Sequence, residues 1–142
     1  MFSSNNWVGK VIRDGRIFDG LDKGPKEYDI EDVYSTPINC KDLLAMYPDG
    51  TMVVYSNSDK ITYGELIDSG VVNTLSFGPI LLKDSEKAEA CVDPGYYISG
   101  ANPRCAWGMV EPGHYVNIVA DGRQPSVSRG MSFYTLSDYF QS

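Results

Sequence analysis

Residues 104–123, RCAWGMVEPGHYVNIVADGR, contain two β-rich runs separated by the turn sequence Glu-Pro-Gly at 111–113. Valine, isoleucine, tyrosine and tryptophan favour strands, and a turn with proline and glycine between two such runs is typical of a hairpin. We therefore expect the runs 105–110 and 114–120 to pair as antiparallel strands. A chain organised around such hairpins favours a largely antiparallel sheet.

Two further hairpins are predicted nearer the N-terminus. Asp-Gly at 14–15 lies between two short apolar runs and suits the positive φ angles of a type I′ turn. The runs 43–47 and 52–55 flank Pro-Asp-Gly at 48–50, which is again a turn sequence. Hairpins are thus expected along most of the chain.

Two short helices are predicted, each after a hairpin. Residues 62–65, Thr-Tyr-Gly-Glu, have the spacing of a capping box and predict a helix near 63–69. The similar segment 132–138 predicts a second helix near 133–141. The order of hairpin, loop and helix therefore occurs twice, which indicates either an internal repeat or a chance similarity.

Composition assigns the remaining segments. Residues 19–36 are rich in Asp, Gly, Lys and Glu, and are expected to form an irregular, exposed connection. Residues 71–82 are apolar and are expected to form two buried strand pieces with a bend at 77–79. The fold class is therefore α+β, with a mostly antiparallel mixed sheet of hairpins and two short helices. A length of 142 residues fits one domain over 1–142 with one core.

Composition also argues against several functional classes. Nineteen acidic and twelve basic side chains give a net charge of -7, which disfavours binding to nucleic acid. No apolar run approaches the ~20 residues that a membrane helix needs. Three cysteines and one histidine are too few and too widely spaced for a zinc site, and we expect neither a metal nor a cofactor. The first seven residues lack the basic and then apolar pattern of a signal peptide.

The three cysteines leave two interpretations open. Cys91 and Cys105 suit a disulfide if the compartment is oxidising. Buried, reduced thiols at Cys40, Cys91 and Cys105 are the favoured interpretation, since free cysteine is among the most buried residue types.

Three short segments near the C-terminus hold the densest group of chemistry-bearing residues: Asn102-Pro103-Arg104, Asp121-Gly122-Arg123 and Ser128-Arg129-Gly130. Antiparallel pairing brings the start of one strand and the end of the next to the same edge, so Arg104 and Asp121 are expected to meet. The third segment leads into the last predicted helix, whose N-terminal N–H groups favour an anion. The group suits the binding and cleavage of an anionic ester. A structural salt bridge in a turn is the alternative.

Several motifs carry a resemblance to a known family: NPRCAWG at 102–108, VADGRQ at 119–124, SRGMSF at 128–133, VIRDG at 11–15 and LSFGPIL at 75–81. They resemble the phosphodiester glycosidase family. That family includes the α-N-acetylglucosaminidase that uncovers mannose 6-phosphate, and bacterial proteins described as exopolysaccharide-related. The resemblance covers nearly the whole chain.

The resemblance implies a hydrolase that acts on a sugar-1-phosphodiester or a related glycosidic linkage. It implies a carbohydrate or sugar phosphate as the partner, and an extracytoplasmic or cell-surface location. Among the catalytic candidates, it implies that Arg104 binds the phosphate or the departing anion, and that Asp121 orients it or acts as acid and base. Ser128 is the third catalytic candidate and lines the pocket. The substrate-binding candidates are Asn102, Arg123, Gly130, Phe77 and Gly78.

Two of these roles have alternatives. Arg123 pairs either with substrate or with Asp121. Ser128 is poorly suited to act as a nucleophile because no base lies near it in the sequence, and His114 begins a strand at the opposite end of its hairpin. We expect His114 to be a surface residue.

The chain departs from the family pattern in two ways. Cys105 stands where the family usually has threonine, which removes a hydroxyl and keeps the size. The family's Asn-Gly-Gly segment before the first hairpin, and its Asn-Leu-Asp-Gly-Gly-Gly-Ser segment after the last helix, have no counterpart in the sequence. The alternative to an active enzyme is therefore a catalytically impaired domain that binds a glycan or an anion.

The second departure leads to an expectation about association. Without a strand after the last helix, the sheet is expected to have an unpaired position near 71–82 and 114–120. The apolar face of helix 133–141, formed by Phe133, Leu136 and Phe140, is expected to be incompletely covered. We therefore expect a homodimer or a larger assembly, and the alternative is a monomer in which residues 1–8 fold back over the gap.

Overall fold

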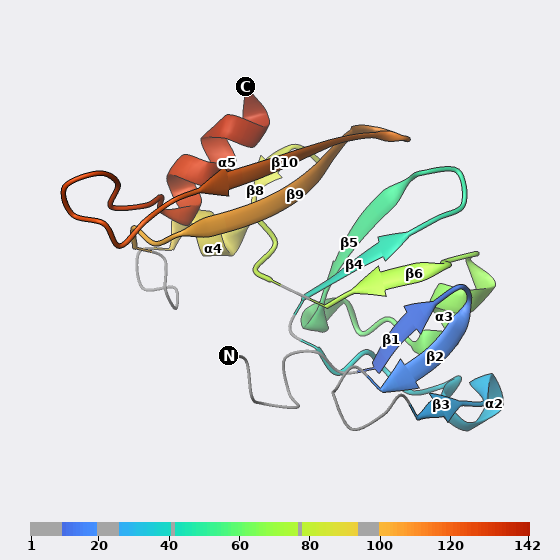
Figure 1. The fold of residues 1–142 in the computed structure, drawn as a ribbon. Coiled ribbons are helices and arrows are strands. Elements are labelled where there is room, and N and C mark those ends of the chain that lie inside the picture. Colours follow the sequence, from blue (N-terminus) through green and yellow to red (C-terminus); the bar gives the residue numbers. More distant parts are fainter. Residues whose placement is uncertain (1–9, 20–25, 41, 77, 94–99) are drawn as a thin grey trace. The chain divides into compact units, whose positions relative to one another are not determined.

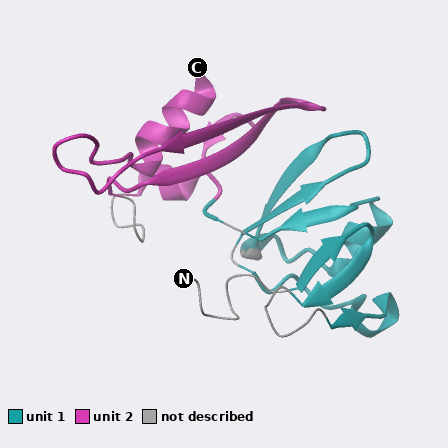
Figure 2. Cartoon of the chain, viewed as in Figure 1, with its two compact units in different colours: residues 1–79 teal, residues 80–142 magenta. Residues whose placement is uncertain are grey.

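The computed structural model describes residues 10–19, 26–40, 42–76, 78–93 and 100–142. These residues form several small antiparallel sheets and four short α-helices, which confirms the predicted α+β class (Figure 1). The chain divides into two compact units, residues 1–79 and residues 80–142 (Figure 2). The proposal that 1–142 is a single domain stays a prediction.

The first sheet of unit 1 has the order β1-β2-β3. Strands β1 (Lys10–Arg13) and β2 (Arg16–Asp19) form the predicted hairpin, and β3 (Glu27–Tyr28) pairs with β2. The turn residues Asp14 and Gly15 have φ angles of 49° and 74°, as a type I′ turn requires.

The second sheet of unit 1 has the order β5-β4-β6. Strands β4 (Asp42–Met46) and β5 (Met52–Ser56) form the second predicted hairpin, which a short 3-10 helix, Asn57–Asp59, follows. Strand β6 (Asn73–Leu75) pairs antiparallel with the other edge of β4. The sheet therefore has β4 at its centre.

Helix α3 (Tyr63–Asp68) lies where the capping box predicts it. The Thr62 hydroxyl accepts from the Glu65 N–H, and the Glu65 carboxylate accepts from the Thr62 N–H at 2.8 Å. These bonds satisfy N–H groups that have no partner within the helix. The buried side chains of Tyr63 and Leu66 then attach the helix to the core.

Two expectations for unit 1 need correction. Within 19–36, residues 27–33 are ordered in β3 and in helix α2 (Ile30–Val33), while residues 20–25 lie outside the described part. Val33 of this helix is buried in the core cluster of unit 1, and the partly buried Ile30 packs against the same cluster. Residues 71–82 are also only partly buried, since Leu75 keeps 45% of its surface exposed. The bend expected at 77–79 stays a prediction, because Phe77 lies outside the described residues; the peptide bond between Gly78 and Pro79 is cis.

Unit 2 begins with a small hairpin of β7 (Leu82–Lys83) and β8 (Glu86–Lys87). Helix α4 (Glu89–Val92) follows, and then the hairpin of β9 (Arg104–Glu111) and β10 (His114–Ala120). The register of the long hairpin pairs Arg104 with Ala120 and Trp107 with Asn117. Helix α5 (Phe133–Gln141) closes the unit and has the predicted bounds.

One face of the β9–β10 hairpin packs against α5, as Figure 1 shows. A Cβ atom at Gly108 would lie 2.8 Å from the Phe140 ring, so the helix approaches the strand closely. Phe133 and Leu136 are buried, and the expectation that this helix face is incompletely covered is wrong for them. Trp107, on the opposite face of the hairpin, is 40% exposed.

Among the described residues, the buried apolar side chains form one cluster in each unit rather than one core. The cluster of unit 1 gathers apolar residues from both of its sheets and from α2 and α3: Ile12, Ile17, Val33, Ile38, Cys40, Leu43, Ala45, Tyr63, Leu66 and Val71. The smaller cluster of unit 2 contains Ala90, Cys91 and Phe133, with Leu81 packed against it.

Among the residues that the structure describes, no helix is long and apolar enough to cross a membrane. Within the same residues, the long hairpin is a two-stranded sheet, so β10 has β9 as its one strand neighbour. The association through a sheet edge stays a prediction, and residues 1–8, which the alternative places over this gap, lie outside the described part.

Candidate active site

Three segments that are separate in the sequence meet at one end of the β9–β10 hairpin. The pairing of Arg104 with Ala120 places Asp121 directly beyond the strand end. An isolated bridge joins Asn102 to Met131, and their backbone N–H and C=O groups exchange bonds of 3.1 and 2.9 Å. The residues 102–104, 121–123 and 128–131 therefore lie together, as the antiparallel geometry predicts.

The Arg104 guanidinium is held by backbone carbonyl groups. Its Nε donates to the Met131 carbonyl at 3.0 Å, and its Nη2 donates to the Gly100 carbonyl at 2.7 Å. Its Cζ atom lies 3.9 Å from the centre of the Phe133 ring, which is the first residue of α5. The side chain is half-buried and fixed beside the start of this helix.

Arg123 joins the same group through Asn102. Its Nη2 donates to Asn102 Oδ1 at 3.2 Å, and Asn102 Nδ2 donates to the Gly100 carbonyl at 3.2 Å. The Gly100 carbonyl thus accepts from both Asn102 and Arg104. Arg123 is exposed and has a φ of 58°, which is uncommon for a residue other than glycine.

Two positive charges therefore share this end of the hairpin. Burial and, secondly, the positive charge of Arg123 lower the pKa of the Arg104 guanidinium below its ordinary value. A negative ligand placed near both guanidinium groups would relieve their repulsion. This electrostatic arrangement favours an anion.

The Ser128 hydroxyl holds the loop together, and Asp121 contributes its backbone carbonyl. The Ser128 hydroxyl donates to the Asp121 backbone carbonyl at 2.7 Å and accepts from the Gly130 N–H at 3.2 Å. Asp121 enters this hydrogen-bonded group through its backbone carbonyl, and the salt bridge of the alternative interpretation stays a prediction. The Asp121 side chain is exposed and directly follows Ala120, the residue that pairs with Arg104.

Two glycines allow the segments to approach this closely. A Cβ atom at Gly130 would lie 2.3 Å from the Asn102 carbonyl carbon, and Gly130 has a φ of 97°. A Cβ atom at Gly122 would lie 2.6 Å from the Pro103 nitrogen. Any larger residue would push the loop away from Asn102.

The N-terminus of α5 completes the arrangement. Ser132 is the N-cap residue, and its hydroxyl accepts from the Thr135 N–H at 3.0 Å. The first N–H groups of a helix have no partner within the helix and carry a partial positive charge. Because Arg104 stacks on Phe133, this end of the helix adds to the positive potential of the site.

The model of the phosphodiester glycosidase family matches residues 8–142, across both units. This chain belongs to the phosphodiester glycosidase family. It is 31% identical over 140 residues to the SPbeta prophage-derived uncharacterized protein YomE of Bacillus subtilis (strain 168). The match covers 99% of this chain and 20% of that protein, so the chain spans about a fifth of the length of this relative. No solved structure matches the chain.

The candidates of this phosphodiester glycosidase domain divide between the two units. Asn102, Arg104, Asp121, Arg123, Ser128 and Gly130 all lie in unit 2 and are brought together there. Gly78 belongs to unit 1, where a Cβ atom added to it would lie 2.8 Å from Asp42 Oδ2, and Phe77 lies outside the described residues. His114 is exposed at the opposite end of the hairpin, as expected, with Nδ1 4.0 Å from Glu111 Oε1.

All three cysteines are free thiols, and the Cys91–Cys105 disulfide is not formed. Cys40 and Cys91 are buried, as the favoured interpretation expects, and burial raises the pKa of each thiol. Cys105 is exposed, so that interpretation is wrong for this residue. Cys105 alternates with Arg104 along β9 and therefore points to the face away from α5, where its thiol donates to Asn117 Oδ1 at 3.5 Å.

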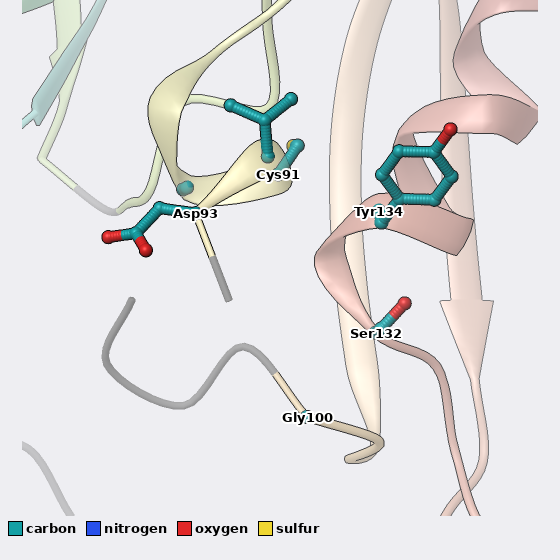
Figure 3. A pocket seen from close by; sticks show the side chains of 7 residues that line it. Cys91, Asp93, Gly100, Ser132 and Tyr134 are labelled. Atoms are coloured by element: carbon teal, nitrogen blue, oxygen red, sulfur yellow. The ribbon is translucent and has the colours of Figure 1, made fainter. Parts of the chain in front are cut away.

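Sequence reasoning did not find a pocket beside this site. The pocket has a volume of about 370 Å³ and is lined by Ala90, Cys91, Val92, Asp93, Gly100, Ser132 and Tyr134 (Figure 3). Three of these residues belong to α4, and a fourth, Asp93, directly follows it. No pattern in the sequence predicted this helix. A four-residue helix is too short to show helical periodicity, and the signal was therefore missing.

Proposed function

We propose that this chain carries the phosphate-binding part of a hydrolase that cleaves a sugar-1-phosphodiester or a related glycosidic linkage. The observation that supports this proposal is that two arginines lie together beside the start of α5. Arg104 donates to the Gly100 carbonyl, and Arg123 donates to Asn102, which itself donates to the same carbonyl. Arginine is suited to phosphate because its planar guanidinium donates two parallel hydrogen bonds. Family membership supports a carbohydrate phosphodiester as the substrate class.

The proposed reaction breaks the bond between the anomeric carbon and the bridging oxygen. Water supplies the hydroxyl group of the released sugar, and its proton passes to the Asp121 carboxylate. The bridging oxygen leaves with the phosphate, whose charge changes from that of a diester to that of a monoester, about -1.5 to -2 at pH 7. Arg104 and Arg123 stabilise the charge that develops in the transition state more than the charge of the substrate, which is the condition for catalysis.

Ser128 has a structural role in this proposal. Its hydroxyl group holds the loop through the Asp121 carbonyl and the Gly130 N–H. A nucleophilic serine needs a neighbouring base, and the imidazole of His114 is at the other end of the hairpin. In this proposal, Ser128 therefore positions the loop that lines the site and does not react with the substrate.

A second candidate function is a domain that binds an anionic glycan without cleaving it. The guanidinium groups of Arg104 and Arg123 support it, because they can bind an anion without the cleavage of any bond. The share of YomE that the chain matches, 20%, also leaves room for catalytic groups elsewhere in a longer protein.

Incubation of the chain with a sugar phosphodiester and with UDP-N-acetylglucosamine tests the two candidates. We expect sugar release that Arg123→Ala and Asp121→Asn each reduce by at least tenfold. Arg129→Ala is the matched control, since it removes the same charge from the same loop. Saturable binding without release would support the second candidate. If the chain shows neither sugar release nor saturable binding, both candidate functions are contradicted.

A further inference from the structure

The two arginines of the candidate site are held in unequal ways. Arg104 is half-buried, donates to two backbone carbonyl groups and stacks on the Phe133 ring. Arg123 is exposed, and the hydrogen bond that ties it to this group runs to a side-chain atom, Asn102 Oδ1, at 3.2 Å. The place of the Arg123 guanidinium therefore depends on the place of an amide oxygen.

The orientation of the Asn102 amide is set by the Gly100 carbonyl. Asn102 Nδ2 donates to this carbonyl at 3.2 Å, and the Gly100 oxygen would repel Oδ1 if the amide were turned round. Oδ1 is consequently directed at Arg123, whose Nη2 donates to it. Both polar atoms of the side chain thus have partners within unit 2.

The backbone of Asn102 is fixed independently of its side chain. Its N–H and C=O groups exchange bonds of 3.1 and 2.9 Å with Met131. Gly130 lies so close that a Cβ atom there would be 2.3 Å from the Asn102 carbonyl. A substitution at Asn102 can therefore remove the amide while the backbone bonds that join the segments remain.

Repulsion between the two arginines acts against the observed arrangement. The positive charge of Arg123 is, after burial, the second cause that lowers the pKa of the Arg104 guanidinium. An exposed arginine has many rotamers, and a neighbouring positive charge favours those that extend into solvent. The bond to Asn102 Oδ1 opposes this tendency before any anion is present.

We infer that Asn102 is a positioning residue, whose side-chain amide holds the Arg123 guanidinium beside Arg104 so that both meet the same anion. The inference rests on the proposed function, and it gives Asn102 a role other than the substrate contact that the family resemblance implies. A donor that is oriented in advance loses less conformational freedom when the anion binds, which increases affinity.

Calorimetric titration of the full chain with sulfate, a tetrahedral dianion, tests the inference. We expect Arg123→Ala and Asn102→Ala each to weaken sulfate binding about tenfold, because each removes an oriented charged donor. The double variant should bind no more weakly than Arg123→Ala, since a residue that acts through Arg123 has no effect without it. Asn117→Ala is the matched control, because it removes the same amide from an exposed position of the same hairpin.

Nuclear magnetic resonance of the arginine Nε–H groups separates positioning from a general loosening of the loop. In Asn102→Ala, the Nε–H of Arg123 should become mobile, while that of Arg104, which donates to a backbone carbonyl, should stay ordered. Asn102→Asp keeps an acceptor oxygen for Arg123 and should leave its Nε–H ordered. Mobility of both groups in Asn102→Ala would indicate a displaced loop and overturn the inference.

The other outcomes separate the inference from the proposed function. If sulfate binding depends on Arg123 but Asn102→Ala leaves it unchanged, or if the two losses add in the double variant, the inference is overturned and the phosphate site stands. If Arg123→Ala does not weaken sulfate binding, or if sulfate does not bind, the proposed phosphate site and the inference are both contradicted.

Discussion

Substitution of Gly130 by alanine tests the close approach on which the arginine group depends. Gly130 has a φ of 97°, and a Cβ atom there would lie 2.3 Å from both the carbonyl carbon and the carbonyl oxygen of Asn102. The positive φ costs a non-glycine residue about 1–2 kcal/mol, and the overlap with a backbone group adds about 1–3 kcal/mol. We expect Gly130→Ala to lower the free energy of unfolding by about 2–5 kcal/mol.

Gly113→Ala is the matched control for this prediction. Gly113 has a φ of 81°, but a Cβ atom at this position meets nothing within 4 Å. Gly113→Ala should therefore lower the free energy of unfolding by about 1–2 kcal/mol, through the backbone conformation alone. Urea unfolding followed by tryptophan fluorescence would measure both variants against the unchanged chain, provided that the denaturant slope m is the same for all three.

The test compares the losses in the free energy of unfolding of the two variants. A Gly130→Ala loss that exceeds the Gly113→Ala loss by about 1–3 kcal/mol would support the close approach of the loop to Asn102. Equal losses would refute it, because the positive φ would then account for the whole effect. The same displacement of the loop should weaken phosphate binding in Gly130→Ala and leave it unchanged in Gly113→Ala.

Three further predictions concern other parts of the chain. Burial raises the pKa of Tyr63 to about 12, so its contribution to stability is complete below pH 10 and is lost between about pH 10 and 12; Tyr63→Phe should show a shallower fall in the free energy of unfolding over that range. Thr62→Ala should lower the free energy of unfolding, measured by thermal unfolding, by about 1 kcal/mol because the capping box is lost. Thr62→Ser keeps a hydroxyl group and should retain most of that free energy. A thiol reagent without reductant should modify Cys105 at once and Cys40 and Cys91 only after denaturation, whereas a titre of one thiol in denaturant would indicate a disulfide.

The local elements of this chain follow from its sequence. The type I′ turn at Asp14, the capping box at Thr62 and the helix that begins after Ser132 depend on residues within a few positions of one another. Such short-range preferences act in the same way in any surrounding structure. The short helices α2 and α4 were missed because one turn of helix has no periodicity to detect.

The grouping of the candidate residues in unit 2 also follows from the sequence. The register of one hairpin is enough to bring Arg104 near Asp121, and the motif segments identify the family that the comparison confirms. The atoms that form the contacts do not follow. Arg104 binds the carbonyl groups of Gly100 and Met131, which every residue type carries, so no side-chain pattern can indicate them.

Tertiary structure alone decided the remaining features. The division of the buried residues into two clusters depends on which apolar faces pack together over long separations, and the amphipathic pattern of a segment is the same for either arrangement. The pocket beside Gly100 arises because α4 and the first turn of α5, about 40 residues apart in the sequence, lie on opposite sides of it. The sequence by itself determined the hairpins, the two capped helices and the family, because those depend on short-range preferences and motifs. The packing of the elements determined which backbone groups hold Arg104 and where the pocket beside Gly100 lies.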